Sequence, residues 1–270
     1  MTHHNFKIQY DLILKTLLKE GIDTEYLIKN NIALQNFQRR QENYPFNLNE
    51  HIKGLVYSLL SNQRPWKKIA ENLDYINEVF KNFDASELKK IENPDYFVIS
   101  LKDKGLGNRA IKKQMQRLKD NITLFESIEI KFGSIDNFIQ RTGKGSNLVH
   151  FDIENVALEF SKPGPNKLDN IGFALAMEYL RNLGYTGAKP DVHINRICSE
   201  ERLGLFDNKS SDVKKHQRLM EITTALNLNL TEVDYVLWLF AAKGYGDICQ
   251  KEPQCSKCLL AEHKVCNRSL

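Results

Sequence analysis

The chain has 270 residues, of which 41% are hydrophobic and 27% are charged, a composition that excludes a disordered chain and allows one or two domains with a core. Lys and Arg total 38 against 34 Asp and Glu, so the formal net charge of +4 permits a polyanionic partner without requiring one. Polar residues interrupt the first apolar stretch, at Lys7, Gln9, Asp11 and Lys15, which argues against a signal peptide or a membrane span. We therefore expect an intracellular, cytoplasmic protein with no membrane partner.

Helical periodicity dominates the first half of the chain, and alternating strand patterns are scarce. Apolar residues at helical spacing predict a helix with one buried face: Ile52, Leu55, Val56, Leu59 and Leu60. Asn47, with Glu50 three residues later, predicts a capping box at its start. The pattern repeats over residues 66–80, and Asn93 followed by Pro94 predicts a further helix start. The fold class is therefore expected to be all-α.

Two polar segments in the second half precede further helical patterns. Leu168 to Gly172, read as LDNIG, suits a turn between helices, because Asn170 tolerates the left-handed conformation. Asp191 precedes VHINR and is a good helix N-cap. Taken alone, these segments are compatible with an ordinary helix connection and an ordinary cap.

Four of the five cysteines lie in the last 22 positions, directly after a buried helix. Residues 233–242 are apolar nearly all round, with Thr231 placed to cap them. The cysteines follow as Cys249-x5-Cys255-x2-Cys258-x7-Cys266. Four thiolates at these intervals can surround one metal site, either a zinc ion or an iron-sulfur cluster. The spacing alone does not choose between them.

The Trp-bearing helix, the GYGDIC turn and the four cysteines resemble the C-terminal cluster loop of endonuclease III, a helix-hairpin-helix (HhH-GPD) DNA glycosylase. The resemblance implies a [4Fe-4S] cluster held by Cys249, Cys255, Cys258 and Cys266, with zinc as the alternative. The family spacing is six, two and five residues, whereas this chain has five, two and seven.

The hairpin and the Asp191 segment extend the resemblance. LDNIG stands where the family has a pattern like LPGVG, whose backbone N–H groups point at a DNA phosphate, so Leu168, Asn170, Ile171 and Gly172 are implied to contact DNA. PDVHINR resembles the family's VDTHIFR, which implies that Asp191 is the catalytic carboxylate. Bifunctional members carry a lysine two positions after the hairpin glycine, where this chain has Ala174.

Two shorter segments match the family's DNA-inserting loops. LLSNQ is similar to the family's LLSAQ, which implies that Gln63 enters the gap left by a flipped nucleotide. GLGN is similar to GLYN, which implies that Leu106 wedges into the opposite strand and that Asn108 also contacts DNA. Basic residues surround this segment and could contact phosphates: Lys102, Lys104, Arg109, Lys112, Lys113, Arg117 and Lys119.

By this resemblance we expect a two-domain helix-hairpin-helix DNA glycosylase architecture. Residues 1–48 would form an extension and a helix that packs on the cluster domain, residues 49–160 a six-helix barrel, and residues 161–270 the hairpin and cluster domain. The implied partner is double-stranded DNA, bound by a monomer associated with the nucleoid.

The predicted activity is hydrolysis of the N-glycosidic bond of a damaged, mismatched or modified base in base excision repair. Because Ala174 cannot form a Schiff base, a monofunctional glycosylase is expected. Two alternatives stay open: a non-catalytic module that binds DNA lesions, and a bifunctional glycosylase/lyase that uses another lysine, such as Lys167 or Lys189. The base that is removed is not encoded in any recognisable motif.

Overall fold

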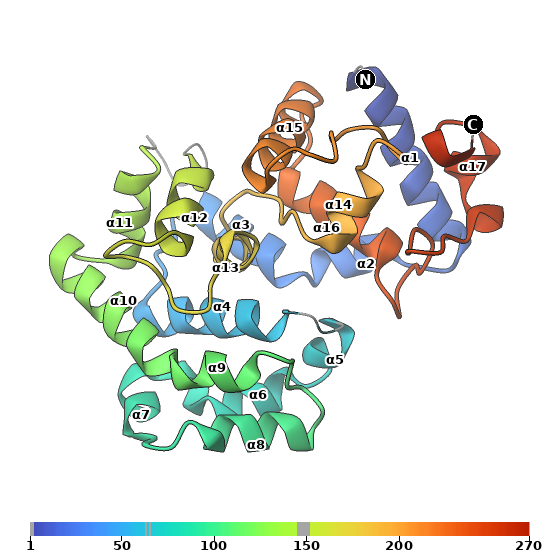
Figure 1. Cartoon of the computed structure of the whole chain (residues 1–270). Coiled ribbons are helices and arrows are strands. Elements are labelled where there is room, and N and C mark those ends of the chain that lie inside the picture. The colour runs from blue at the N-terminus through green and yellow to red at the C-terminus, as the bar shows by residue number, and fades with distance from the viewer. Residues whose placement is uncertain (1–2, 63, 65, 145–151, 270) are drawn as a thin grey trace. The chain divides into compact units, whose positions relative to one another are not determined.

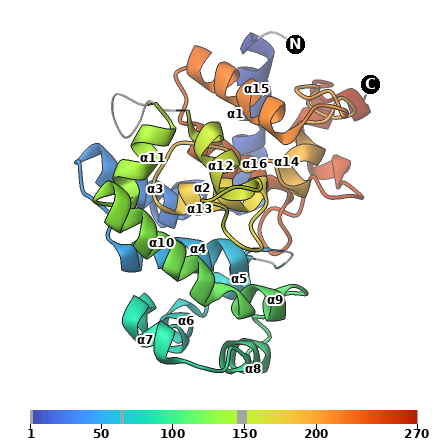
Figure 2. The same cartoon turned by 60° about the vertical axis from the view of Figure 1, so that its left-hand side comes forward.

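A computed structural model describes residues 3–62, 64, 66–144 and 152–269. The described residues form helices α1 to α17 and three short 3-10 helices, and they contain no strand beyond one isolated β-bridge between Ser199 and Phe206 (Figures 1 and 2). The predicted all-α class is confirmed. Among the described helices, none has the length and apolar character needed to cross a membrane.

The chain divides into two compact units. The middle unit is Asn36–Tyr185, and the terminal unit combines Met1–Gln35 with Thr186–Leu270. These boundaries differ from the predicted ones after residues 48 and 160. The reason for the second difference is that the segment after residue 160 is tied to the middle unit, where α12 and α13 pack on each other and α13 packs on α4.

The middle unit begins inside α3 and ends after α13. Its helices are α3 (Ile32–Gln41), α4 (Leu48–Leu60), α5 (Trp66–Ala70), α6 (Leu73–Val79), η1 (Lys81–Phe83), α7 (Ala85–Lys90), α8 (Asp95–Asp103), α9 (Ile111–Gln116), α10 (Leu118–Phe132), α11 (Ile135–Thr142), α12 (Ile153–Ser161) and α13 (Phe173–Asn182). The periodic stretch over residues 66–80 is divided into α5 and α6. The break falls at Glu71 and Asn72, where the side chain of Asn72 donates to the carbonyl of Lys68 at 2.9 Å and so occupies an acceptor at the end of α5.

Helix α4 forms as the sequence predicts. The predicted capping box is present, because the Asn47 side chain accepts from the Glu50 N–H and the Glu50 carboxylate accepts from the Asn47 N–H. On α13, the Leu175 carbonyl accepts a hydrogen bond from the Ser58 hydroxyl at 2.6 Å. Gly54 allows the close approach of Leu183, whose Cγ would lie 3.2 Å from an added Cβ. These two contacts hold the first turn of α13 and its C-terminal end against α4.

A buried ionic cluster stabilises the opposite end of α13. The Arg40 guanidinium donates two hydrogen bonds to the Asp136 carboxylate, both 2.9 Å, and Tyr185 donates a third at 2.7 Å. His51 Nε2 lies 3.3 Å from the same carboxylate. Burial disfavours the charge of Asp136, but hydrogen bonds from His51 and Arg40, together with the Arg40 charge, hold its pKa well below the usual range.

The terminal unit has its own hydrophobic core, built from α1 and the C-terminal helices. Its helices are α1 (His3–Lys19), α2 (Thr24–Lys29), α14 (Val192–Ile197), α15 (Asp212–Ala225), α16 (Leu230–Ala241), η2 (Cys255–Lys257), α17 (Leu259–Glu262) and η3 (Asn267–Ser269). Helix α16 is buried nearly all round, as predicted. The predicted cap at Thr231 is wrong by two residues, because the Asn229 side chain accepts from the N–H groups of Thr231 and Glu232, and the Thr231 hydroxyl instead bonds Gly187.

Candidate nucleic-acid interface and metal centre

The hairpin between α12 and α13 places its aliphatic side chains in the core of the middle unit. Leu168 and Ile171 are buried, and the Leu168 N–H donates to the Phe160 carbonyl at 2.9 Å. Asn170 is exposed and takes a φ of 60°, the left-handed conformation that the sequence predicted for it. The four hairpin residues assigned to DNA therefore divide into two core anchors, Leu168 and Ile171, and two exposed positions, Asn170 and Gly172.

Gly172 is the residue before α13, and the fold does not explain why it is a glycine. Its backbone is extended, with φ −97° and ψ 174°, which any residue adopts. A Cβ added there would meet no heavy atom within 4 Å. No side chain caps α13, so the first N–H groups of this helix have no acceptor within the helix, and the exposed Gly172 before them carries no side chain. Such a helix start favours a bound anion.

The GLGN loop is held inside the middle unit. Leu106 is completely buried, and Asn108 is 6% exposed. The Asn108 amide donates to the Leu59 carbonyl at 2.9 Å and to the Gln114 side chain at 3.0 Å, and its oxygen accepts from the Ala110 N–H. Neither side chain offers a surface to DNA in this arrangement, which differs from the contacts that the resemblance implies. Asn108 joins the end of α4 to α9, and Leu106 lies in the core.

The matching glutamine of the LLSNQ segment, Gln63, lies outside the described residues. Its neighbour Arg64 is exposed, and its Nε donates to the Gly107 carbonyl at 2.6 Å, so the two short loops lie against each other. The basic residues predicted to contact phosphates are exposed, apart from Lys119, which is half-buried. Positive charge therefore gathers around loops that are tied together.

Asp191, in the terminal unit, is the N-cap of α14, as the sequence predicts. Its Oδ1 accepts hydrogen bonds from the N–H groups of His193 at 2.8 Å and Ile194 at 3.1 Å. The carboxylate is half-buried, and the neighbouring Val192 is exposed. Burial lowers the pKa of His193, against the opposing effect of the Asp191 charge, and so favours a neutral imidazole. The result is a rigid, hydrogen-bonded carboxylate at an accessible helix start.

No lysine occupies the position that carries the Schiff-base lysine in bifunctional family members, because Ala174 stands there in the first turn of α13. Lys167 lies near the hairpin, and its Nζ donates to the Leu168 carbonyl at 3.1 Å. The backbone of Lys189 is fixed two residues before Asp191, where its N–H donates to Asp234. Lys167 therefore bonds the hairpin backbone, and Lys189 flanks the Asp191 segment.

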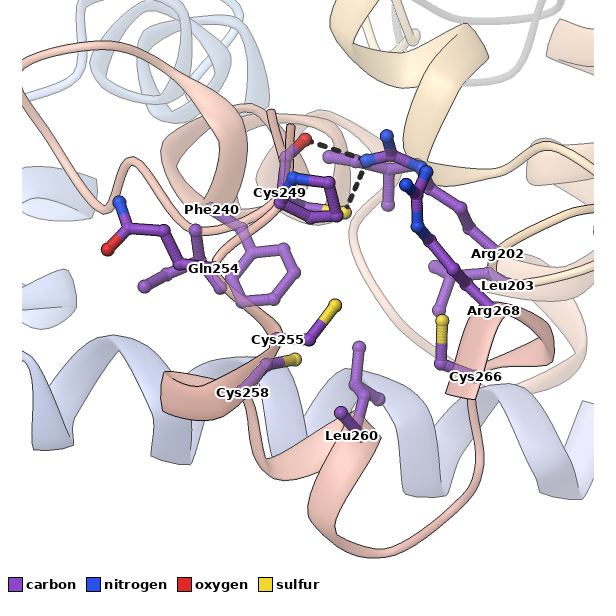
Figure 3. A pocket seen from close by; sticks show the side chains of 14 residues that line it. Arg202, Leu203, Phe240, Cys249, Gln254, Cys255, Cys258, Leu260, Cys266 and Arg268 are labelled. Atoms are coloured by element: carbon purple, nitrogen blue, oxygen red, sulfur yellow. Dashed lines mark hydrogen bonds between the residues drawn. The ribbon is translucent and has the colours of Figure 1, made fainter. Parts of the chain in front are cut away.

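The four C-terminal cysteines line one pocket of the terminal unit (Figure 3). The pocket lies between the loop after α16 and the segment that carries α17. Apolar side chains form much of its wall, among them Leu203, Phe240 and Leu260. In the described part of the chain, no three Cys, His, Asp or Glu side chains lie close enough together to hold a single metal ion. The thiols therefore surround a shared space without converging on one point.

Arg202 reaches this pocket from the segment after α14. It is 4% exposed, and Figure 3 shows its guanidinium donating to the Cys249 Sγ, at 2.8 Å, and to the Cys249 carbonyl, at 3.0 Å. A third hydrogen bond, at 2.7 Å, reaches the Gln250 carbonyl. Burial raises the pKa of the Cys249 thiol to about 11, and the charge and hydrogen bond of Arg202 oppose that shift. The guanidinium thus fixes the start of the cysteine loop.

Arg202 and the buried Asn121 of α10 are the site residues that sequence reasoning missed. Arg202 lies in the short segment ERLGLF, where no spacing or motif distinguishes it from a surface arginine. Asn121 carried a weak signal, because it occupies a position on the apolar face of a helix that Leu118, Ile122 and Phe125 also share. A polar residue on such a face needs a partner.

Comparison with known proteins gives a likeness in fold. No protein-family model matches the chain, and no curated protein matches it. Among solved structures it is similar to the 8-oxoguanine DNA glycosylase of Methanocaldococcus jannaschii, with 20% identity, a TM-score of 0.52, and coverage of 89% of this chain and 97% of that one. It is also similar to the 8-oxoguanine glycosylase/lyase of the same organism in complex with a 15mer DNA containing 8-oxoguanine, with 22% identity, a TM-score of 0.49, and coverage of 82% and 96%. The first likeness shows that the chain has the fold of a helix-hairpin-helix DNA glycosylase.

Proposed function

We propose that this protein is a DNA N-glycosylase that hydrolyses the bond between a damaged, mismatched or modified base and its deoxyribose. The observation that carries the proposal is the Asp191 carboxylate, which two backbone N–H groups fix at the start of α14 in a chain with this fold. A fold alone does not define an activity, which depends on the residues that each unit carries.

Double-stranded DNA is the proposed partner. The hairpin, residues 168–172, is the proposed site that grips a DNA phosphate. The exposed backbone at Asn170 and Gly172 and the open N–H groups at the start of α13 suit a phosphate oxygen. The exposed basic residues around the Leu106 loop would add contacts to the backbone that do not depend on base sequence. Leu106 and Asn108 would act by holding that loop together, since their side chains are buried.

Asp191 is the proposed catalytic residue. Cleavage of an N-glycosidic bond develops positive charge on the sugar, and an ionised carboxylate can stabilise that charge or accept a proton from the attacking water. Hydrogen bonds from the His193 and Ile194 N–H groups to Oδ1 hold the Asp191 carboxylate in one orientation. Water adds to the anomeric carbon, the base departs with the bonding electrons and takes up a proton, and an abasic site remains.

Ala174 supports hydrolysis without strand cleavage. A methyl group cannot form the imine through which a lyase nicks DNA, and the nearby Lys167 amine is hydrogen-bonded to the Leu168 carbonyl. We therefore propose a monofunctional glycosylase.

The four cysteines that line one pocket have the chemistry of a metal centre, because thiolates are the usual ligands of both structural zinc and iron-sulfur clusters. We propose that Cys249, Cys255, Cys258 and Cys266 hold a [4Fe-4S] cluster, with zinc as the alternative. Such a group would supply a fixed charge and crosslink the C-terminal loop.

A gel assay on labelled duplexes tests the proposal. Each duplex carries one altered base and is divided into untreated and alkali-treated halves, and 8-oxoguanine belongs in the panel because the structural relative acts on it. Strand breaks that require alkali would support a monofunctional glycosylase and identify its base. Breaks without alkali, together with borohydride trapping of a covalent adduct, would show a lyase that uses a lysine at another position.

Asp191→Asn tests the catalytic role. We expect it to abolish base release and to preserve DNA binding, because the amide keeps the shape and the N-cap acceptor but loses the charge. Asp84→Asn is a matched control, since Asp84 caps α7 through the Glu87 N–H. Its base release should equal that of the wild type. Full turnover by Asp191→Asn would refute the assignment and favour a non-catalytic DNA-binding module or an unassigned catalytic group.

A further inference from the structure

A tertiary contact sets the conformation of the hairpin. The side-chain amide of Asn121, on α10, meets the backbone of Asp169 at two points. Its Nδ2 donates to the Asp169 carbonyl at 3.2 Å, and its Oδ1 accepts from the Asp169 N–H at 2.7 Å. An amide that pairs with both groups of one residue fixes the direction of that residue's backbone as well as its distance.

The position of Asn121 is costly unless these bonds are made. The residue is 2% exposed and lies on the apolar face of α10 beside Leu118, Ile122 and Phe125. A buried amide without partners destabilises a fold, and asparagine is a poorer helix former than the leucine that would suit this face. The hydrogen bonds to Asp169 satisfy both ends of the amide. This pairing gives a physical reason for an asparagine at this position.

A second, weaker contact acts on the next residue. The exposed Asn170 donates from its Nδ2 to the Lys113 carbonyl, at the outer surface of α9, at 3.0 Å. Arg117 Nε lies 3.7 Å from the Asp169 carboxylate, but both side chains are about half exposed, so this ion pair adds little. Of the side chains that bond or pair with Asp169 and Asn170, Asn121 is therefore the buried one.

The structural consequence reaches Gly172. The hairpin here has Asp169 in place of a proline, so no ring fixes the φ of that residue. The buried side chains of Leu168 and Ile171 anchor the hairpin in the core. Between them, Asn121 holds the backbone of Asp169. Rotation of that peptide would change where the N–H groups before and within the first turn of α13 point.

We propose that Asn121 is a positioning residue for DNA binding: it orients the hairpin so that the backbone at Gly172 meets a phosphate. This inference rests on the proposed function, because it assumes that the hairpin grips DNA. Asn121 does not contact DNA itself. It acts through the hydrogen-bonded backbone of Asp169.

A double-mutant cycle tests the inference in the full-length protein. The probe is a fluorescein-labelled duplex that carries one tetrahydrofuran abasic-site analogue, and its dissociation constant is measured at a temperature where circular dichroism shows each variant folded. Asn121→Leu removes both hydrogen bonds at similar volume and should weaken binding about tenfold, the effect of losing one charge-assisted hydrogen bond. In a Gly172→Ala background, where the grip is already blocked, the same substitution should have less than about a twofold further effect.

Two further variants separate positioning from general stability. Asn182→Leu is the matched control, because Asn182 is also a buried asparagine of the middle unit that donates to a backbone carbonyl, that of Gly54, but it lies at the far end of α13. It should lower the melting temperature without weakening DNA binding. If Asn121→Leu does not fold, Asn121→Asp replaces it, since aspartate keeps the shape and the acceptor but cannot donate to the Asp169 carbonyl. Amide exchange at Asp169 should be faster in Asn121→Leu, which removes the acceptor of the Asp169 N–H, than in Asn121→Asp, which keeps it.

The outcomes are distinguishable. Wild-type affinity in a folded Asn121 variant, or equal losses in the presence and absence of Gly172→Ala, would overturn the positioning role while leaving the hairpin grip intact. Wild-type affinity in Gly172→Ala would overturn both the grip and the inference that rests on it. A loss in Asn121→Leu that disappears in the Gly172→Ala background supports the inference.

Discussion

Gly172→Ala separates the folding role of the hairpin glycine from its binding role. The backbone there is extended, and the added methyl group meets no atom within 4 Å. Alanine restricts the unfolded chain, which stabilises the fold by about 0.4–1 kcal/mol, but it is a poorer N-cap residue than glycine, by about 1 kcal/mol. The two effects oppose each other, so the free energy of unfolding should change by less than about 1 kcal/mol.

Binding should respond differently. A methyl group on the outer face of Gly172 separates the backbone N–H groups from a phosphate, and the loss of one charge-assisted hydrogen bond corresponds to about 1.5–3 kcal/mol, or roughly 10- to 100-fold in the dissociation constant. Urea unfolding followed by circular dichroism measures stability, and fluorescence anisotropy with labelled duplex measures affinity.

Gly184→Ala is the comparison variant, because Gly184 is a glycine that the fold requires. Gly184 has a φ of 80°, and a Cβ there would lie 2.3 Å from the Asn36 carbonyl oxygen. This variant should be strongly destabilised. Our reasoning about Gly172 would be refuted if Gly172→Ala were destabilised to a similar degree, or if it were stable and bound DNA with wild-type affinity.

Three further predictions concern the buried polar groups. Because the pKa of Asp136 is depressed in the folded protein, its contribution to stability is present above the unfolded pKa near 4 and is lost as the pH falls below that value. Chemical unfolding in a pH series should show this loss, and in Asp136→Asn the free energy of unfolding should depend less on pH in the acid range. Asn108→Leu removes one donor to the Leu59 carbonyl and the side-chain acceptor of the Ala110 N–H, so it should lower stability by about 2–3 kcal/mol. A stable Asn108→Leu that binds DNA poorly would instead support direct contact. Arg202→Leu should reduce the visible absorbance that the proposed iron-sulfur cluster would give, since three hydrogen bonds to residues 249 and 250 are lost. An absorbance equal to that of the wild type would show that Arg202 is not needed to hold the proposed cluster.

Local signals in the sequence determined the helices and their starts. The capping box at Asn47 and Glu50, the cap at Asp191 and the left-handed Asn170 all depend on residues within a few positions of each other. Spacing within one helix likewise predicted the buried faces of α4 and α16. These features could be predicted because their hydrogen bonds and periodicities close within one turn of chain.

Only the tertiary structure decided which of the matching residues are accessible and what supports them. Leu106 and Asn108 lie in a motif that implies DNA contact, yet their side chains are buried against elements distant in sequence. Asn121 meets Asp169 across 48 positions, and Arg202 meets Cys249 across 47. Sequence patterns do not predict such pairs, because the partner of a side chain at that separation depends on how whole helices pack. The energy of the contact is gained only once those helices have packed.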